Sequence, residues 1–117
     1  MATAESPISD MLVTVKSREI QRGLLAEMRG DRKTAARHLL AAAHLELVLA
    51  KDYEIARQAR LAFRSLLSAA SCMWQAGECD QALRLLQQLK RQIKGRRAEI
   101  DEVIEDLRKN GTRPKSR

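Results

Sequence analysis

The residues best suited to chemistry in this sequence are two histidines and two cysteines. His38 and His44 are six residues apart, so on a helix they point about 120° away from each other. They therefore cannot bind one metal ion together, and surface or helix-packing roles are favoured. Cys72 and Cys79 are seven residues apart, which is the spacing of neither a redox pair nor a zinc site.

The surroundings of these residues do not suggest an enzyme. Cys72 has no histidine close to it in the sequence, and its helical setting favours a small core residue over a nucleophile. The sequence contains no glycine-rich phosphate loop, no HExxH motif and no GxSxG motif. We therefore expect no enzyme activity, and hence no catalytic residue, metal site or cofactor.

Basic residues are concentrated towards the C-terminal end of the chain. Five of the eight residues from 90 to 97 are basic, although the net charge of +7 is otherwise spread along the sequence. Cations near a helix C-terminus offset the helix dipole, which accounts for this basic cluster without a ligand. The alternative is a docking site for phosphates or an acidic partner, although no aromatic side chains alternate with the basic ones to stack single-stranded nucleic acid. The basic cluster consists of Lys90, Arg91, Lys94, Arg96 and Arg97.

The elements that must position these residues are helices. Hydrophobic residues make up 44% of the chain and charged residues 32%, so it can fold, while an aromatic content of 3% disfavours a β-sandwich or barrel. Apolar residues recur at helical spacing between Gly30-Asp31 and Gly77-Glu78, turns that each end one helix and cap the next. The pattern predicts an all-α domain of five antiparallel helices. We expect them over residues 7–29, 32–50, 53–76, 79–94 and 97–109, with a further turn at Lys51-Asp52-Tyr53.

The helix predicted over residues 32–50 is apolar around most of its circumference. A helix with so narrow a polar side must lie between neighbours, so we expect it at the centre of the domain. Leu39 and Ala42 should then be almost inaccessible to solvent. The narrow polar stripe consists of Arg37, His44 and Lys51, which are seven residues apart.

Glu46 falls on the apolar side of this central helix, about 180° from Arg37. A buried carboxylate is costly unless it is paired or hydrogen-bonded. We therefore predict a basic or hydrogen-bonding partner for Glu46, such as Arg57 or Arg60 on the following helix.

Two predicted hairpins carry the same series of residues. Each has a small residue where its helices cross, a glycine–acid turn, and small and large residues in alternation on the second helix. This series resembles the tetratricopeptide repeat, which implies a right-handed stack of helical hairpins with the fifth helix as a cap. The turns are 47 residues apart instead of about 34, so the helices between them must be several turns longer in all. The series is Gly23, Gly30-Asp31, Ala35, Leu39 and Ala42 in the first hairpin, and Ala70, Gly77-Glu78, Ala82, Leu86 and Leu89 in the second.

Two apolar surfaces are candidate partner sites. The first is a groove on the inner face of the hairpins, which suits an amphipathic helix or a second copy of the chain, unless the same residues form core. The lysine and asparagine with which many tetratricopeptide domains bind a C-terminal carboxylate are absent from it. The second is an apolar stripe on the first helix, which has no obvious partner within the chain and predicts self-association. The alternative is that the first helix folds over the long third helix and buries the stripe internally. The groove residues are Ile20, Leu24, Met28, Arg64, Leu67, Ser71 and Trp74, and the self-association residues are Ile8, Met11, Leu12 and Val15.

These observations predict one domain over residues 7–111, between a disordered N-terminus (1–6) and a disordered basic tail (112–117). No stretch approaches the about 18–20 apolar residues of a membrane span, and the cysteine pattern is typical of a cytoplasmic protein with reduced thiols. We expect a non-enzymatic protein–protein interaction module that binds a protein or peptide, with a homodimer as one form of it. The alternative is a helical nucleic-acid-binding domain that uses residues 90–97.

Overall fold

The computed structural model describes residues 7–110, which form helices and turns without a β-strand in this range. The expected all-α class is therefore confirmed. Residues 1–6 and 111–117, which include both segments expected to be disordered, lie outside the described residues. The helices are α1 (Pro7–Met28), α2 (Arg32–Ile55), α3 (Ala59–Gln75), α4 (Cys79–Gln92), the short 3-10 helix η1 (Lys94–Arg96) and α5 (Arg97–Asn110).

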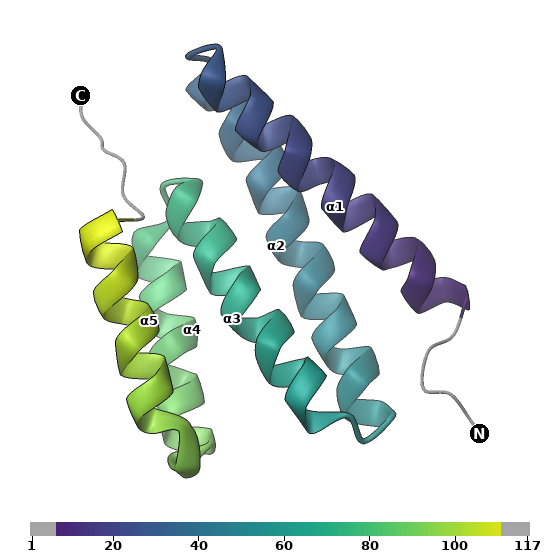
Figure 1. Ribbon diagram of the computed structural model, residues 1–117, viewed down its shortest axis with the longest axis vertical. Helices are drawn as coiled ribbons and strands as arrows, with labels where there is room; N and C mark the ends of the chain where they lie inside the picture. Colours follow the sequence, from purple (N-terminus) through teal and green to yellow (C-terminus); the bar gives the residue numbers. More distant parts are fainter. Residues whose placement is uncertain (1–6, 111–117) are drawn as a thin grey trace.

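The helices lie next to one another across a flat molecule whose principal axes measure 49 × 32 × 16 Å (Figure 1). Consecutive α-helices run in opposite directions. The backbone of α1, at one edge, approaches only that of α2, while α2 packs against both α1 and α3. The helices α4 and α5 form the other edge. The prediction that the second helix is the central one is confirmed.

Small side chains allow α2 to pack closely against its neighbours. Ala42 and Ala43 are fully buried and Leu39 is 1% exposed, as predicted. The closest approach is at Gly23 of α1, where an added Cβ would lie 2.9 Å from Cγ of Leu39 and 3.4 Å from the carbonyl oxygen of Ala35. No side chain fits at Gly23 without moving Leu39, so the distance between α1 and α2 depends on this glycine.

The second half of the chain closes the core. Phe63 and Trp74 of α3 are buried in the same cluster as the apolar stripes of α4 and α5. The acidic side chains of α5 are exposed to solvent. The buried stripe residues are Ala82, Leu86 and Leu89 of α4, and Ile100, Ile104 and Leu107 of α5.

Three helix–helix turns share one hydrogen-bonding pattern. In each, a residue with positive φ follows the helix: Gly30 (78°), Arg57 (63°) and Gly77 (94°). The next backbone N–H donates to the carbonyl oxygen five residues earlier, at 2.9, 2.7 and 2.8 Å respectively. This is the Schellman arrangement, which satisfies carbonyls at a helix end and favours glycine at the left-handed position. The second turn places an arginine there.

The prediction of a turn at Lys51-Asp52-Tyr53 is wrong. The helix α2 continues to Ile55, and the turn follows at Ala56 and Arg57, so Tyr53 belongs to α2 instead of α3. Ala56 is exposed and does not pack beside Phe63 and Trp74. The sequence misled because the left-handed position is occupied by arginine, so no glycine marks the turn.

We expect Gly23→Val to lower the free energy of unfolding by about 1–3 kcal/mol, because the added carbons must displace the buried Leu39. Chemical denaturation followed by circular dichroism measures this change. Gly95→Ala is the matched control, because no atom lies within 4 Å of the added Cβ, and it should leave stability unchanged or slightly raised. Equal effects at the two glycines would contradict the close approach of α1 and α2.

Arg57→Gly should raise the free energy of unfolding by about 0.5–1 kcal/mol. The left-handed conformation costs an L-residue about 1–2 kcal/mol, and the greater freedom of glycine in the unfolded chain offsets part of the gain. The same change at Arg64, an exposed position inside α3, should instead destabilise by about 1 kcal/mol. Denaturation midpoints that fall for both variants would disprove the strain at Arg57.

Candidate interaction surface

Exposed apolar side chains are concentrated in the first hairpin. Among residues 7–110, nine large hydrophobic side chains are exposed, and all nine belong to α1 or α2. The helices α3, α4 and α5 contribute none to this set, because their apolar stripes face the core. The exposed residues are Ile8, Met11, Val13, Val15, Leu24, Leu25 and Met28 of α1, and Val48 and Ile55 of α2.

The contact between Glu19 and His38 shows which of these residues share a face. The carboxylate of Glu19 lies 2.6 Å from Nδ1 of His38, across the junction of α1 and α2. Met11 and Val15 are eight and four residues before Glu19, so they continue along α1 on the same side of this junction. Leu45, seven residues after His38, continues along α2 in the same way.

The two stripes therefore run beside each other and form one apolar area, which we call the α1–α2 surface. Val48 and Ile55 extend the α2 stripe at spacings of three and seven residues. Their side chains are 49% and 74% exposed, and those of Ile8 and Met11 are 65% and 66% exposed. The α1–α2 surface consists of Ile8, Met11, Val15, Leu45, Val48 and Ile55.

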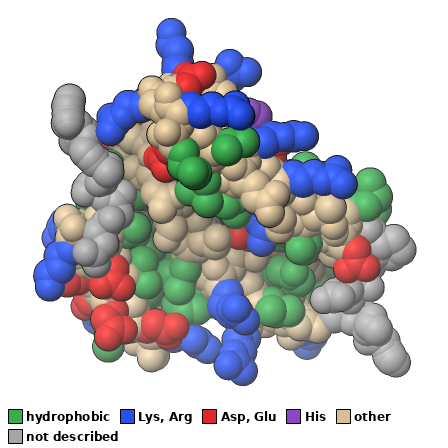
Figure 2. Space-filling view, turned by 45° about the horizontal axis from the view of Figure 1, so that its top comes forward, with side chains coloured by type: hydrophobic (Ala, Val, Ile, Leu, Met, Phe, Trp, Pro, Cys, Tyr) green, Lys and Arg blue, Asp and Glu red, His purple; other side chains and the backbone are tan. Residues whose placement is uncertain are grey.

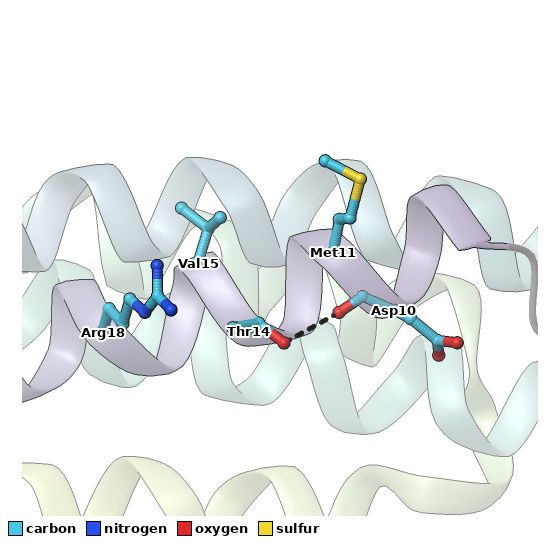
Figure 3. A pocket seen from close by; sticks show the side chains of 5 residues that line it. All are labelled: Asp10, Met11, Thr14, Val15 and Arg18. Carbon is cyan, nitrogen blue, oxygen red and sulfur yellow. Dashed lines mark hydrogen bonds between the residues drawn. The ribbon is translucent and has the colours of Figure 1, made fainter.

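A shallow depression lies along α1 at the edge of this surface (Figure 3). Met11 and Val15 point to the same side of the helix, and the side chains of Asp10 and Arg18 lie at the two ends. Thr14 lies between them and donates a hydrogen bond to the carbonyl oxygen of Asp10 at 3.2 Å. The depression is open and combines an apolar middle with one acidic and one basic end.

The opposite side of the junction is closed by a buried ion pair. Nζ of Lys16 lies 3.2 Å from Oε2 of Glu46, and the Glu46 side chain is 3% exposed. The prediction that Glu46 is buried with a basic partner is confirmed, but the choice of Arg57 or Arg60 is wrong. Arg57 lies in the turn after α2 and Arg60 points to solvent, whereas Lys16 of α1 reaches across the junction.

Leu12 also lies on this closed side. It packs against a small cluster formed by Leu49, Tyr53 and Ala62, and it is half-buried. Four residues are expected to mediate self-association. Ile8, Met11 and Val15 are exposed, whereas Leu12 packs against the core.

Cys72 lies near the ion pair and is chemically quiet. Burial and, to a smaller extent, the negative charge of Glu46 raise the pKa of its thiol to about 11, although the positive charge of Lys16 opposes this rise. The thiol therefore stays protonated at neutral pH, and the thiolate that a nucleophile needs is not formed.

The predicted groove residues are distributed between surface and core. Trp74 is buried at 8% exposure, and Ile20 is half-buried against the main core. Leu24 and Met28 are exposed on α1, and Arg64 is exposed on α3. Leu67 and Ser71 are half-buried. Because the backbones of α1 and α3 do not touch, these residues are spread over both sides of α2.

Part of the basic cluster is used within the fold. Lys90 pairs with Asp101 at 2.7 Å. Arg96 pairs with Glu99 at 3.2 Å, and its guanidinium lies 4.6 Å from the centre of the Phe63 ring. These contacts hold η1 and α5 against α3 and α4. The remaining three cations, Arg91, Lys94 and Arg97, are exposed and take part in none of the ion pairs found within residues 7–110.

The histidines do not form a metal site. Nδ1 of His38 is hydrogen-bonded to the carboxylate of Glu19, and Nδ1 of His44 lies 2.8 Å from the carbonyl oxygen of Leu40. Within the described part of the chain, no group of three or more histidine, cysteine or acidic side chains could hold a metal ion.

The surface near the α1–α2 turn has a different character. Arg29, Arg32 and Lys33 are exposed there, and Figure 2 shows lysine and arginine side chains around this end of the molecule. The apolar residues of the α1–α2 surface lie towards the other end of the hairpin. Sequence reasoning missed Leu45, Val48 and Ile55, because it limited the exposed side of the central helix to the stripe of Arg37, His44 and Lys51.

Comparisons with protein-family models, curated proteins and solved structures found no match to this chain. None of the helices formed by residues 7–110 is long and apolar enough to cross a membrane. The class that the structure defines is thus an all-α protein, and its function must be argued from its surface.

The pair of Glu19 and His38 makes stability depend on pH. The hydrogen bond with His38 holds the pKa of Glu19 below its ordinary value of 4.5; partial burial opposes this, and Arg22 adds to the lowering. Because the folded-state pKa is depressed, the carboxylate stabilises the fold above about pH 4.5. That contribution is lost as the pH falls through the lower folded-state value.

We therefore expect Glu19→Gln to be less stable than the wild type at pH 7, with a difference that shrinks below about pH 4.5. Thermal unfolding from pH 3 to pH 7 measures this difference. Glu105→Gln is the control, because its contact with Lys109 is exposed and 4.0 Å long. A difference between wild type and Glu19→Gln that stayed constant with pH would argue against the carboxylate as its source.

Proposed function

We propose that this chain is a non-enzymatic protein–protein interaction module and that the α1–α2 surface is its docking surface. One observation supports this most directly, namely that every large hydrophobic side chain exposed within residues 7–110 lies on the first hairpin. A fold that buries the apolar stripes of three other helices leaves this one open. Such exposed apolar areas on folded proteins usually mark interaction sites.

The shape of the surface favours a protein as the partner. Small-molecule sites are concave and enclose most of their ligand, with a few convergent polar groups. The α1–α2 surface runs along two neighbouring helices, and the depression beside it is shallow and open. Each Å² of apolar area that is removed from water stabilises a complex by about 25 cal/mol, and this would drive association with another folded surface or helix.

The arrangement of hairpins is consistent with a tetratricopeptide-like array, which we include in the proposal. Three features support it: the close approach at Gly23, the matching turns at Gly30 and Gly77, and the buried Ala70 and Ala82 on the helices of the second hairpin. Small residues at helix crossings and repeated turns are typical of such arrays.

Nucleic-acid binding by the basic cluster is the second candidate. The exposure of Arg91, Lys94 and Arg97 favours it, whereas the internal contacts of Lys90 and Arg96 leave fewer cations for phosphates. The two functions differ in their response to salt. Binding to phosphates should weaken steeply as salt concentration rises, whereas binding through an apolar surface should not.

Val48→Glu tests the docking surface. The wild-type chain, immobilised, should retain specific proteins from an extract of its source cells, and the glutamate should weaken their binding at least about tenfold, because it would be buried without a partner. Circular dichroism should be unchanged, since Val48 is already 49% exposed.

Gln87→Glu, which adds the same charge to the exposed side of α4, is the matched control and should retain the wild-type partners. If Val48→Glu retains them equally well, the docking surface is not on α1 and α2.

A further inference from the structure

We propose that the α1 part of the α1–α2 surface binds the same part of a second copy of the chain, with the two α1 helices antiparallel about a twofold axis near Thr14. The inference rests on the proposed function, because it names the occupant of the same docking surface. The charge pattern of the depression on α1 supports it.

Asp10 and Arg18 stand at opposite ends of that depression (Figure 3). They are eight residues apart, or about 12 Å along the helix axis, which is too far for an ion pair with each other. Neither takes part in an ion pair found within residues 7–110. Each chain therefore presents one unpaired acidic group and one unpaired basic group, separated by the apolar side chains of Met11 and Val15.

An antiparallel second copy brings each charged end opposite the end of opposite charge. With the axis near Thr14, Asp10 of each copy lies opposite Arg18 of the other, which gives two equivalent ion pairs. Met11 of each copy then lies opposite Ser17 of the other, about 3 Å along the axis from Val15, so the apolar side chains lie between the two ion pairs. A parallel pairing would instead place Asp10 against Asp10 and Arg18 against Arg18, and like charges would repel.

The interface is formed by α1, because Thr14 is nine residues before Gly23, or about 180° around the helix from the residue that contacts α2. Antiparallel pairing about Thr14 overlaps about 15 residues of α1, or about 22 Å. A contact through one helix of each chain is small compared with the about 1,200–2,000 Å² that stable complexes bury, so we expect a dissociation constant in the micromolar range.

Charge exchange at Asp10 and Arg18 provides the test. Sedimentation equilibrium from about 1 to 100 µM should show the wild type passing from monomer to dimer. Asp10→Arg and Arg18→Asp should each weaken the dimer at least about tenfold, because each places like charges opposite one another. An equimolar mixture of the two variants should dimerise again, and so should the double variant Asp10→Arg/Arg18→Asp.

Asp80→Arg is the matched control, because Asp80 is also an exposed aspartate in the first turn of a helix, and it should dimerise like the wild type. Circular dichroism checks that each variant keeps its helices. The inference is overturned if the wild type stays monomeric at 100 µM, or if the mixture and the double variant fail to restore the dimer. A monomeric wild type leaves the docking surface to another protein, which the retention experiment with Val48→Glu decides separately.

Discussion

The close packing of α1 on α2 is the constraint on which the rest of the structure depends. Gly23 leaves no room for a Cβ beside Leu39, and Ala42 and Ala43 of α2 are fully buried. Helices can approach this closely only where side chains are small, and the interior is too densely packed to absorb added carbons. The backbone of α1 approaches no other helix backbone, so its position is set by this junction together with the side-chain contacts of Leu12 and Ile20 with the core.

The buried pair of Lys16 and Glu46 gives this junction its orientation. Replacing such a pair with apolar residues is often neutral or stabilising, but removing one partner leaves a buried charge and costs several kcal/mol. A rotation of α1 that separated Lys16 from Glu46 would therefore be unfavourable. The pair holds Leu12 towards the core and, as a consequence, turns Met11 and Val15 towards solvent.

The exposure of the α1–α2 surface is thus a consequence of how the first hairpin is held together. The later helices each have a neighbour for their apolar stripe, and the contacts of Arg96 with Phe63 and Glu99 fix the last hairpin in place. The first helix has a neighbour on one side only. A second apolar stripe of this edge helix remains uncovered, and Asp10 and Arg18 beside it take part in no ion pair found within residues 7–110, which is the basis of the partner that we propose.

Helical periodicity and glycine turns predict the helical class, three of the five helices to within about two residues, and the burial of Leu39, Ala42 and Glu46. The α2–α3 turn could not be found from the sequence, since Arg57 occupies a position that glycine usually marks, and both helices beside it were therefore misplaced at one end. The pairing of Lys16 with Glu46, and the position of Val48 and Ile55 on one surface with Met11, follow from the packing of the folded chain. Periodicity assigns residues to a face of a helix, but the packing between helices decides which faces become covered.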